Sequence, residues 1–225
     1  SDLENVDNAL TQGKKIIITA GPTYERIDPV RFIGNYSTGK MGFALAHVCA
    51  EAGAKVLLVA GPVQQFMEHP NVTRIDVESA QQMYEVVLTH FHESDGAILC
   101  AAVADFTPVQ IANQKLKRHK EHLIIELKPT KDIALEVGKL KTKNQFLVGF
   151  ALETNDEEQH ALDKLRRKNL DFIVLNSLND ADACFGFDTN KITILKATGE
   201  KIQFGLKSKL EVAEDIVNEL DKQLT

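Results

Sequence analysis

A glycine-rich stretch near the N-terminus is the first feature of the sequence that could carry chemistry. Residues 34–41 read GNYSTGKM, which nearly matches the phosphate-binding pattern G-x-x-x-x-G-K followed by Ser or Thr. The last position is Met41, which offers no hydroxyl to Mg²⁺, and the preceding apolar run ends at Ala20, too early for a P-loop. Ser37 and Gly39 nevertheless stand where a helix should begin, and free N–H groups and the helix dipole favour an anion there.

Two polar residues just ahead of this stretch are candidates for contact with a substrate. Arg31 and Asn35 lie four residues apart and flank the apolar pair Phe32 and Ile33. A guanidinium and an amide in such a segment need polar partners. The pattern leaves two interpretations open: a structural clamp within the loop, or a charge-assisted contact with a carboxylate or phosphate.

A nicotinamide-binding interpretation fits the same region less well. The glycines Gly34, Gly39 and Gly42 do not form G-x-G-x-x-G, and Gly61-Pro62 stands where an acidic residue would hold the ribose. Tyr36 and Lys40 have the Y-x-x-x-K spacing of short-chain dehydrogenases, but they lie in an early loop, so we interpret the spacing as coincidence. A Rossmann-type NAD(P)-dependent reductase remains an alternative with these two features against it.

The elements that would position these residues alternate between buried strands and helices. Strands are predicted at residues 14–20, 55–60, 74–77, 96–104, 122–127, 145–152 and 171–175, with a hairpin at residues 191–204. Helices are predicted at residues 42–52, 79–91, 132–140, 156–169 and 208–224. Strands that are apolar on both faces indicate a parallel sheet covered on both sides. We expect an α/β fold with a doubly wound, Rossmann-like, mostly parallel sheet, helices on both faces, and a C-terminal β-hairpin arm.

Composition limits the class of protein. The 225 residues have a net charge of -6, which argues against nucleic acid as a partner because phosphates require an excess of basic charge. No apolar run approaches the ~20 residues of a membrane span. Three scattered cysteines and the lack of a signal-peptide core predict the cytoplasm. We expect one nucleotide-binding domain over residues 1–225, with residues 1–13 as a loose N-terminal arm.

Several motifs together resemble one known family. The stretch ITAGPTYERIDPVRFIGNYSTGKMGFALA resembles the N-terminal signature of the phosphopantothenoylcysteine synthetases, also called phosphopantothenate–cysteine ligases. Further matches follow in order: AAVADF at residues 101–106, the basic run at 115–118, GFALET at 149–154, and the stretch from Lys164 to Asp171. Nothing resembles the flavin-binding decarboxylase half of the bifunctional members, so the resemblance implies a ligase-only chain or an excised domain.

The resemblance implies a two-step reaction in coenzyme A biosynthesis. The carboxylate of 4′-phosphopantothenate attacks the α-phosphate of a nucleoside triphosphate and releases pyrophosphate. The amine of L-cysteine then attacks the acyl nucleotide, releasing the monophosphate and forming 4′-phosphopantothenoyl-L-cysteine. CTP is the expected co-substrate, as in bacterial members, with ATP as the near alternative, and Mg²⁺ is expected with either. The family is homodimeric with sites near the interface, which implies a homodimer here.

The resemblance also implies roles for particular residues. Asn35 matches the asparagine that orients the acyl intermediate, Arg31 the arginine beside it, and Lys115 the lysine that acyl-nucleotide formation requires on a segment that closes over the site. The expected nucleotide-binding residues are Ser37, Gly39, Ala101, Ala102, Asp105, Lys115, Phe150, Lys164 and Lys168. From the pattern alone, the lysines could equally be solvated and Phe150 a core residue. A non-catalytic nucleotide-sensing module is the remaining alternative.

Overall fold

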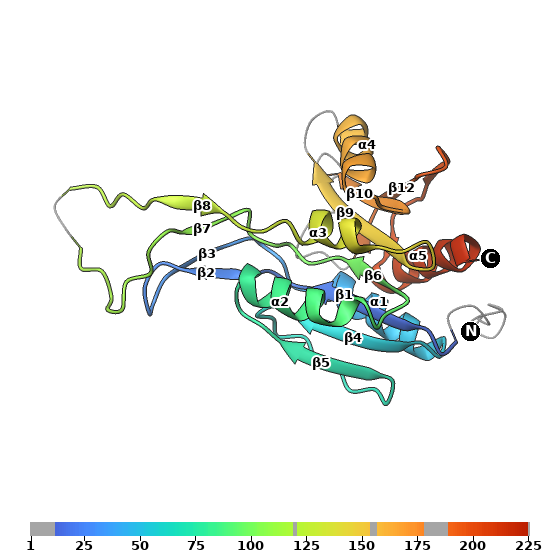
Figure 1. Ribbon diagram of the computed structural model, residues 1–225, viewed down its shortest axis with the longest axis horizontal. Coiled ribbons are helices and arrows are strands. Elements are labelled where there is room, and N and C mark those ends of the chain that lie inside the picture. The colour runs from blue at the N-terminus through green and yellow to red at the C-terminus, as the bar shows by residue number, and fades with distance from the viewer. Residues whose placement is uncertain (1–11, 119–120, 154–156, 178–188, 225) are drawn as a thin grey trace.

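The computed structural model describes residues 12–118, 121–153, 157–177 and 189–224, and an eight-stranded sheet forms its centre (Figure 1). In spatial order β13-β12-β10-β9-β6-β1-β4-β5, the strands are Lys201–Gln203, Ile192–Lys196, Phe172–Ser177, Phe146–Glu153, Gly96–Leu99, Lys15–Ala20, Lys55–Ala60 and Val72–Asp76. The six strands from β10 to β5 run parallel, and β12 and β13 are antiparallel. The predicted mostly parallel sheet is confirmed.

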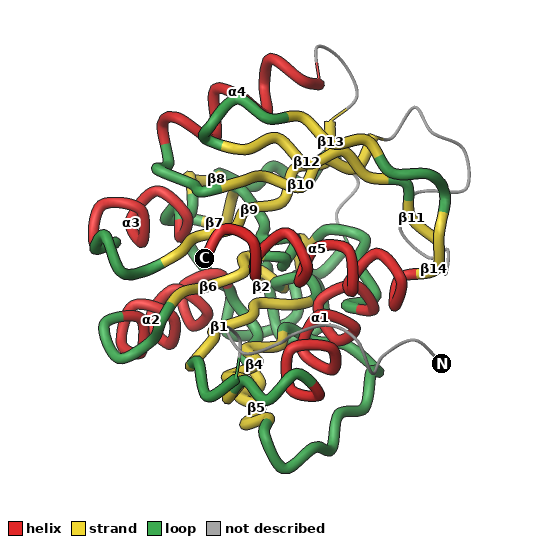
Figure 2. Tube along the Cα trace, turned by 90° about the vertical axis from the view of Figure 1, so that its right-hand side faces the viewer, coloured by secondary structure: helices red, strands yellow, loops and turns green. Residues whose placement is uncertain are grey.

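Helices cover both faces of the sheet (Figure 2). The helices are α1 (Lys40–Glu51), α2 (Ala80–Phe91), α3 (Ile133–Leu140), α4 (Glu157–Arg167) and α5 (Lys209–Leu224). One apolar core lies under α1 and α5 and includes Ile16 and Ile18 of β1, whereas the other lies under α2, α3 and α4 and includes Ile17. Alternate residues of one strand therefore feed opposite cores, as the two-residue period of a strand requires.

The order of the strands creates a switch point beside β1. The chain leaves β1 through α1 to β4 on one side, and later returns to β6 on the other side. In open parallel sheets, the diverging loops at such a point leave a crevice at the carboxyl ends of the strands, where ligands bind. The candidate residues after β1 and β6 meet at this crevice.

Two short ladders project from the body of the molecule (Figure 1). Strands β2 (Tyr24–Arg26) and β3 (Phe32–Gly34) form one, and β7 (Phe106–Pro108) and β8 (Leu127–Pro129) form the other. The strand predicted at residues 122–127 is wrong, because only Leu127 is in a strand and the ladder continues to Pro129. Ile124 is 89% exposed, so the alternation of apolar residues here does not mark a strand packed against the core.

The ends of several elements follow from local chemistry. Ser79 caps α2 as predicted: its side chain accepts from Gln82 N, and the Gln82 side chain accepts from the backbone of Ser79 in return. The predicted C-terminal hairpin is confirmed as β12 and β13, which form one edge of the main sheet. Two further strands, β11 (Thr189–Asn190) and β14 (Lys207–Ser208), pair beside it. Of the predicted N-terminal arm, residues 1–11 lie outside the described residues.

A close backbone approach holds the loops after β1 and β4 together. Gly61 N donates to Ala20 O over 2.9 Å, and a Cβ on Gly61 would lie only 1.6 Å from Pro22 O. No side chain fits at that distance, so Gly61 sets how closely the two loops pack. The loop after β1 carries the candidate residues, and its position therefore depends on Gly61.

We expect Gly61→Ala to lower the free energy of unfolding by about 3 kcal/mol, since the new methyl group must push backbone aside. Urea unfolding followed by circular dichroism measures the change. Gly205→Ala is the matched control, because a Cβ on Gly205 meets nothing within 4 Å and should cost less than about 0.5 kcal/mol. Equal midpoints for the two variants would contradict the packing described.

Candidate active site

A rigid loop after β6 forms the centre of the candidate site. Ala101 N donates to Thr19 Oγ1 over 3.1 Å, Ala102 N to Gly21 O over 2.8 Å, and Ala104 N to Thr23 Oγ1 over 3.0 Å. We call residues 101–104 the central loop. Because three of its backbone amides are bonded to the end of β1 and to the segment that follows it, the two sides of the switch point are fixed relative to each other.

Asn35 lies against this central loop. Its Nδ2 donates to Ala102 O over 3.3 Å and to Val103 O over 3.1 Å. Both protons of the amide are thereby used to fix the side chain, although the residue itself is exposed. The amide oxygen remains an acceptor at the edge of the sheet, where a substrate could reach it.

One cavity of about 590 Å³ opens on the α1 and α5 face of the sheet, and we call it the α1-side hollow. Its lining includes Asn35, Tyr36, Ser37, Gly39, Lys40, Cys100, Ala101, Ala102, Phe150, Asn176, Asn190 and Lys209. Phe150 packs against the core under α1 and α5, so its ring belongs to this face. The volume suits a nucleotide-sized ligand.

A second cavity of about 290 Å³ opens on the opposite face, and we call it the α4-side hollow. Its lining includes Thr19, Ala101, Val103, Asp105, Thr130, Asp132, Phe150, Lys164 and Lys168. Ala101, Val103 and Phe150 line both hollows. The two cavities therefore meet at the central loop, where a group bound in one could react with a group bound in the other.

The N-terminus of α1 borders the α1-side hollow. Gly39 is the N-cap with φ 78°, and no side chain caps the helix. The hydroxyls of Ser37 and Thr38 accept from Gly39 N and Lys40 N only over 3.3 and 3.4 Å. A helix N-terminus with long local bonds and no acidic residue in its first turn favours an anion.

Two lysines bring positive charge to the α4-side hollow. Lys164 on α4 and Lys168 just beyond it are four residues apart and share one helix face. Lys168 Nζ lies 3.1 Å from Asp132 Oδ2, while Asp132 Oδ1 caps α3 by accepting from Leu135 N. An anion that binds Lys168 must therefore share it with Asp132.

Arg31 and Lys115 lie outside the lining of both hollows. Arg31 Nη1 donates to Asp28 Oδ2 over 2.6 Å and to Leu116 O over 3.1 Å. Of the two interpretations that the sequence allowed for Arg31, these bonds match the structural clamp. Lys115 is exposed, next to the clamped Leu116. The structure thus gathers nine of the eleven predicted site residues at the hollows and places Arg31 and Lys115 in the projecting part.

Sequence reasoning missed several residues that line the hollows. Asn176 is the next-to-last residue of β10, and its buried Oδ1 has no hydrogen-bond partner among the described residues. Lys209 bonds to Asn190 Oδ1 nearby. Asn176 could have been found, because it follows a buried parallel strand at the edge where ligands bind. No local pattern joins Lys209 and Asn190 to the site.

Cys100 also lines the α1-side hollow. Burial raises the pKa of the Cys100 thiol to about 12, although the charge of Lys209 lowers it, so Cys100 is not a thiolate nucleophile at neutral pH. In the described ranges, no three His, Cys, Asp or Glu side chains gather to hold a metal ion. None of the described helices is long and apolar enough to cross a membrane.

Comparison with known sequences identifies relatives over nearly the whole chain. The family described as DNA/pantothenate metabolism flavoprotein C-terminal domain matches residues 11–224. A protein of an unknown prokaryotic organism, named cysteine/cysteine sulfinic acid decarboxylase, is 54% identical over 92% of this chain and 58% of its own length. The coenzyme A biosynthesis bifunctional protein CoaBC of Bacillus subtilis (strain 168) is 47% identical over 95% of this chain and 52% of its own length. The chain thus spans about half the length of these relatives.

Solved structures agree with this relationship. The crystal structure of the C-terminal domain of the bifunctional protein CoaBC is 42% identical, covers 96% of this chain and 97% of that one, and superposes with a TM-score of 0.81. A Cab2 mutant in complex with phosphopantothenate-cysteine is 15% identical, covers 99% and 91%, and has a TM-score of 0.76, which shows a shared fold. The chain therefore belongs to the DNA/pantothenate metabolism flavoprotein C-terminal domain family, which confirms the predicted resemblance to the phosphopantothenoylcysteine synthetases.

Proposed function

We propose that this chain joins 4′-phosphopantothenate to L-cysteine through an acyl nucleotide, acting in the cytoplasm as a single catalytic domain. The observation that carries the proposal is the pair of hollows on opposite faces of the sheet that meet at the central loop beside Asn35. A ligase of this kind must bring two anionic substrates together, and the two hollows bring groups bound on either face of the sheet to the same loop.

In the first step the substrate carboxylate attacks the α-phosphorus of the nucleotide, and pyrophosphate leaves with the bridging oxygen. We place the base at Phe150 and the backbone of Ala101 and Ala102, with the polyphosphate toward Lys164 and Lys168. The N-terminus of α1 at Ser37 and Gly39 supports the phosphates from the other side. Little proton transfer is needed, so positioning and positive charge supply most of the rate.

In the second step the cysteine amine attacks the acyl carbon, and the nucleoside monophosphate leaves with the former carboxylate oxygen. Asn35 is held by Ala102 O and Val103 O, so its carbonyl end has a fixed position from which to orient the acyl group. Arg31 forms an ion pair with Asp28. It would contact the acyl substrate only if its guanidinium bound both groups at once.

CTP is the proposed co-substrate, with ATP as the alternative that the same hollows could accept. Mg²⁺ would neutralise phosphate charge in the α4-side hollow. Among the described residues Asp105 and Asp132 are the carboxylates there, too few for an all-protein cage. This donor set fits Mg²⁺, which usually keeps several waters and binds one or two carboxylates plus substrate phosphates.

Pyrophosphate release from CTP or ATP, with and without 4′-phosphopantothenate and cysteine, tests the proposal directly. We expect release that requires phosphopantothenate, and amide that appears only when cysteine is added. Nucleotide binding without any release would favour a sensing module instead. Oxidation of NADPH or NADH by the protein would favour a reductase.

We expect Asn35→Asp to form the acyl nucleotide at nearly the normal rate but to form amide about 100-fold more slowly. The added carboxylate opposes the negative charge that develops on the acyl oxygen when the amine attacks. Rapid-quench assays separate the two half-reactions. An equal loss in both half-reactions would remove the role assigned to Asn35.

Lys115→Gln should slow pyrophosphate release itself by about 100-fold, because the long side chain of Lys115 would bring its charge over the nucleotide. Single-turnover release with saturating phosphopantothenate measures the effect. Lys117→Gln, two residues further along the same basic run, is the matched control and should stay within about threefold of the unchanged protein. Normal release by Lys115→Gln would refute the role.

A second copy of this chain is the proposed partner of the projecting ladders. Exposed apolar side chains gather there, among them Val30, Phe32, Phe106, Ile111, Leu123 and Ile124. Phe32 stacks on Tyr24 with ring centroids 3.7 Å apart, which leaves its other side exposed. Monomeric proteins rarely expose large contiguous apolar surface, so these side chains fit a homodimer interface near the site.

Ile124→Asp should weaken this dimer at least about 10-fold, because the new carboxylate would be buried without a partner. Analytical ultracentrifugation over a range of concentrations measures the dissociation constant. Phe66→Asp is the matched control, since Phe66 is 80% exposed but lies in the loop between β4 and β5 and belongs to neither ladder. A fully active monomer would contradict the dimer.

A further inference from the structure

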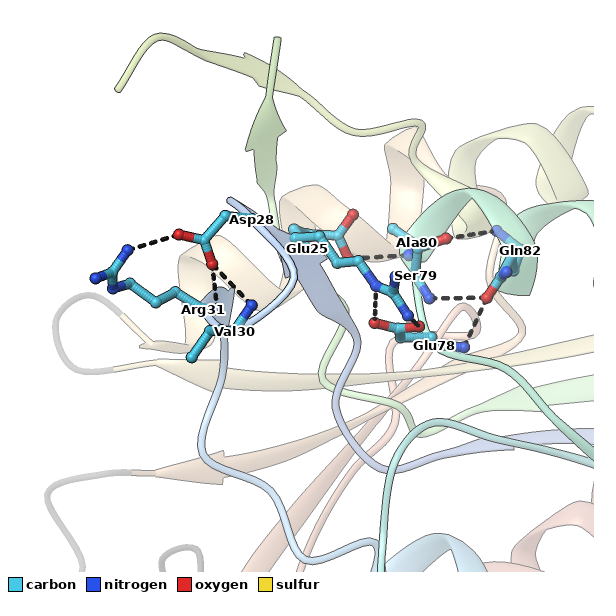
Figure 3. Close-up of polar contacts among 9 residues, drawn as sticks. Glu25, Asp28, Val30, Arg31, Glu78, Ser79, Ala80 and Gln82 are labelled. Atoms are coloured by element: carbon cyan, nitrogen blue, oxygen red, sulfur yellow. Dashed lines mark hydrogen bonds and ion pairs between the residues drawn. The ribbon is translucent and has the colours of Figure 1, made fainter. Parts of the chain in front are cut away.

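Asp28 is a buried carboxylate in the turn between β2 and β3, and the proposed reaction gives it no role. The residue is 1% exposed. Its Oδ1 accepts from Val30 N over 2.8 Å and from Arg31 N over 2.7 Å, so the carboxylate closes its own turn (Figure 3). A turn of this length could be closed by one oxygen, which leaves the second oxygen available for another task.

The second oxygen reaches a segment that is distant in sequence. Asp28 Oδ2 accepts from Arg31 Nη1 over 2.6 Å and from Leu116 N over 3.0 Å. Arg31 Nη1 also donates to Leu116 O over 3.1 Å. Both backbone groups of Leu116 are thus held by one ion pair, a reciprocal arrangement that fixes the orientation of that peptide segment as well as its position.

A further hydrogen bond holds the same segment on the other side of Lys115. Ala112 N donates to Ile27 O over 3.0 Å, so the same turn holds the segment before Lys115 as well as after it. Adjacent Cα atoms are about 3.8 Å apart, so fixing Leu116 restricts where the Lys115 side chain can start. The lysine head can still move, because its long side chain is exposed.

The surroundings of Asp28 keep its carboxylate negatively charged. Burial raises the pKa of Asp28, but the N–H donors of Leu116, Val30 and Arg31 and the Arg31 charge outweigh it and lower the pKa to about 2. Asp28 is therefore ionised at neutral pH. The carboxylate is acceptor-only in this form, which is what all four of its donors require.

We propose that Asp28 is a positioning residue that holds the lysine-bearing segment through Leu116 and Arg31, so that Lys115 starts from a fixed point beside the site. The catalytic part of this inference rests on the proposed ligase function, whereas the structural part stands without it. Arg31 therefore also helps to hold this segment, in addition to any contact that it makes with substrate.

Hydrogen exchange of the Leu116 amide tests the structural part. In the unchanged protein this amide should exchange at least about 100-fold more slowly than in an unstructured peptide. Asp28→Asn keeps the shape but turns one acceptor into a donor, and should speed exchange at Leu116 at least about 10-fold. An unprotected Leu116 in the unchanged protein would overturn the inference, whether or not Asp28→Asn folds.

Glu78→Gln is the matched control. Glu78 forms an equally close pair with Arg26 of β2, at 2.7 and 2.8 Å (Figure 3). This pair is more exposed and has no hydrogen bond to residues 112–118 among the described contacts. Glu78→Gln should leave Leu116 exchange unchanged, and equal effects of the two variants would contradict a specific role for Asp28.

A double-mutant comparison tests the catalytic part. Asp28→Asn should slow pyrophosphate release about 10-fold in the unchanged background and hardly at all in the Lys115→Gln background, since it acts through Lys115. Additive losses would show a role independent of Lys115 and overturn the positioning claim. If the unchanged protein releases no pyrophosphate, the proposed ligase function fails, while the exchange result at Leu116 still decides the structural part.

Discussion

The candidate site depends on the bonding of the central loop to the segment that leaves β1. Three backbone amides, those of Ala101, Ala102 and Ala104, are held by Thr19, Gly21 and Thr23 across the switch point. Parallel strands alone would leave these loops free to diverge. Because they are bonded instead, the crevice has a fixed floor, and hollows on opposite faces of the sheet reach the same edge.

Positive charge near that edge comes from two kinds of source. Fixed charge comes from rigid elements: the N-terminus of α1 on one face and the helix that carries Lys164 on the other. A movable charge comes from the exposed Lys115 in the projecting part, whereas Arg31 is clamped to Asp28. The fixed and the movable charges lie apart. Their separation suits a reaction in which the nucleotide is bound first by the body and then covered, since excluding water strengthens each remaining electrostatic contact.

The sequence was sufficient to predict most of the elements, because these follow from local patterns, and nine of the residues that it singled out line the hollows. Buried β-branched runs indicated the strands, Ser79 indicated a cap, and the resemblance located Asn35 and Lys168. Long-range pairing was out of reach: nothing near Arg31 indicates that its guanidinium contacts Leu116, or that Lys168 is paired with Asp132. The strand expected at residues 122–127 failed because apolar alternation reports an apolar face without saying what covers it.

Oxygen-18 transfer tests the central claim, activation of the carboxylate as an acyl nucleotide, most directly. The protein would turn over 4′-phosphopantothenate labelled in both carboxylate oxygens, with CTP and cysteine, and mass spectrometry would locate the label. The account predicts one labelled oxygen in the nucleoside monophosphate and one in the amide product. Label in inorganic phosphate would indicate an acyl phosphate, and an unlabelled monophosphate would contradict the account.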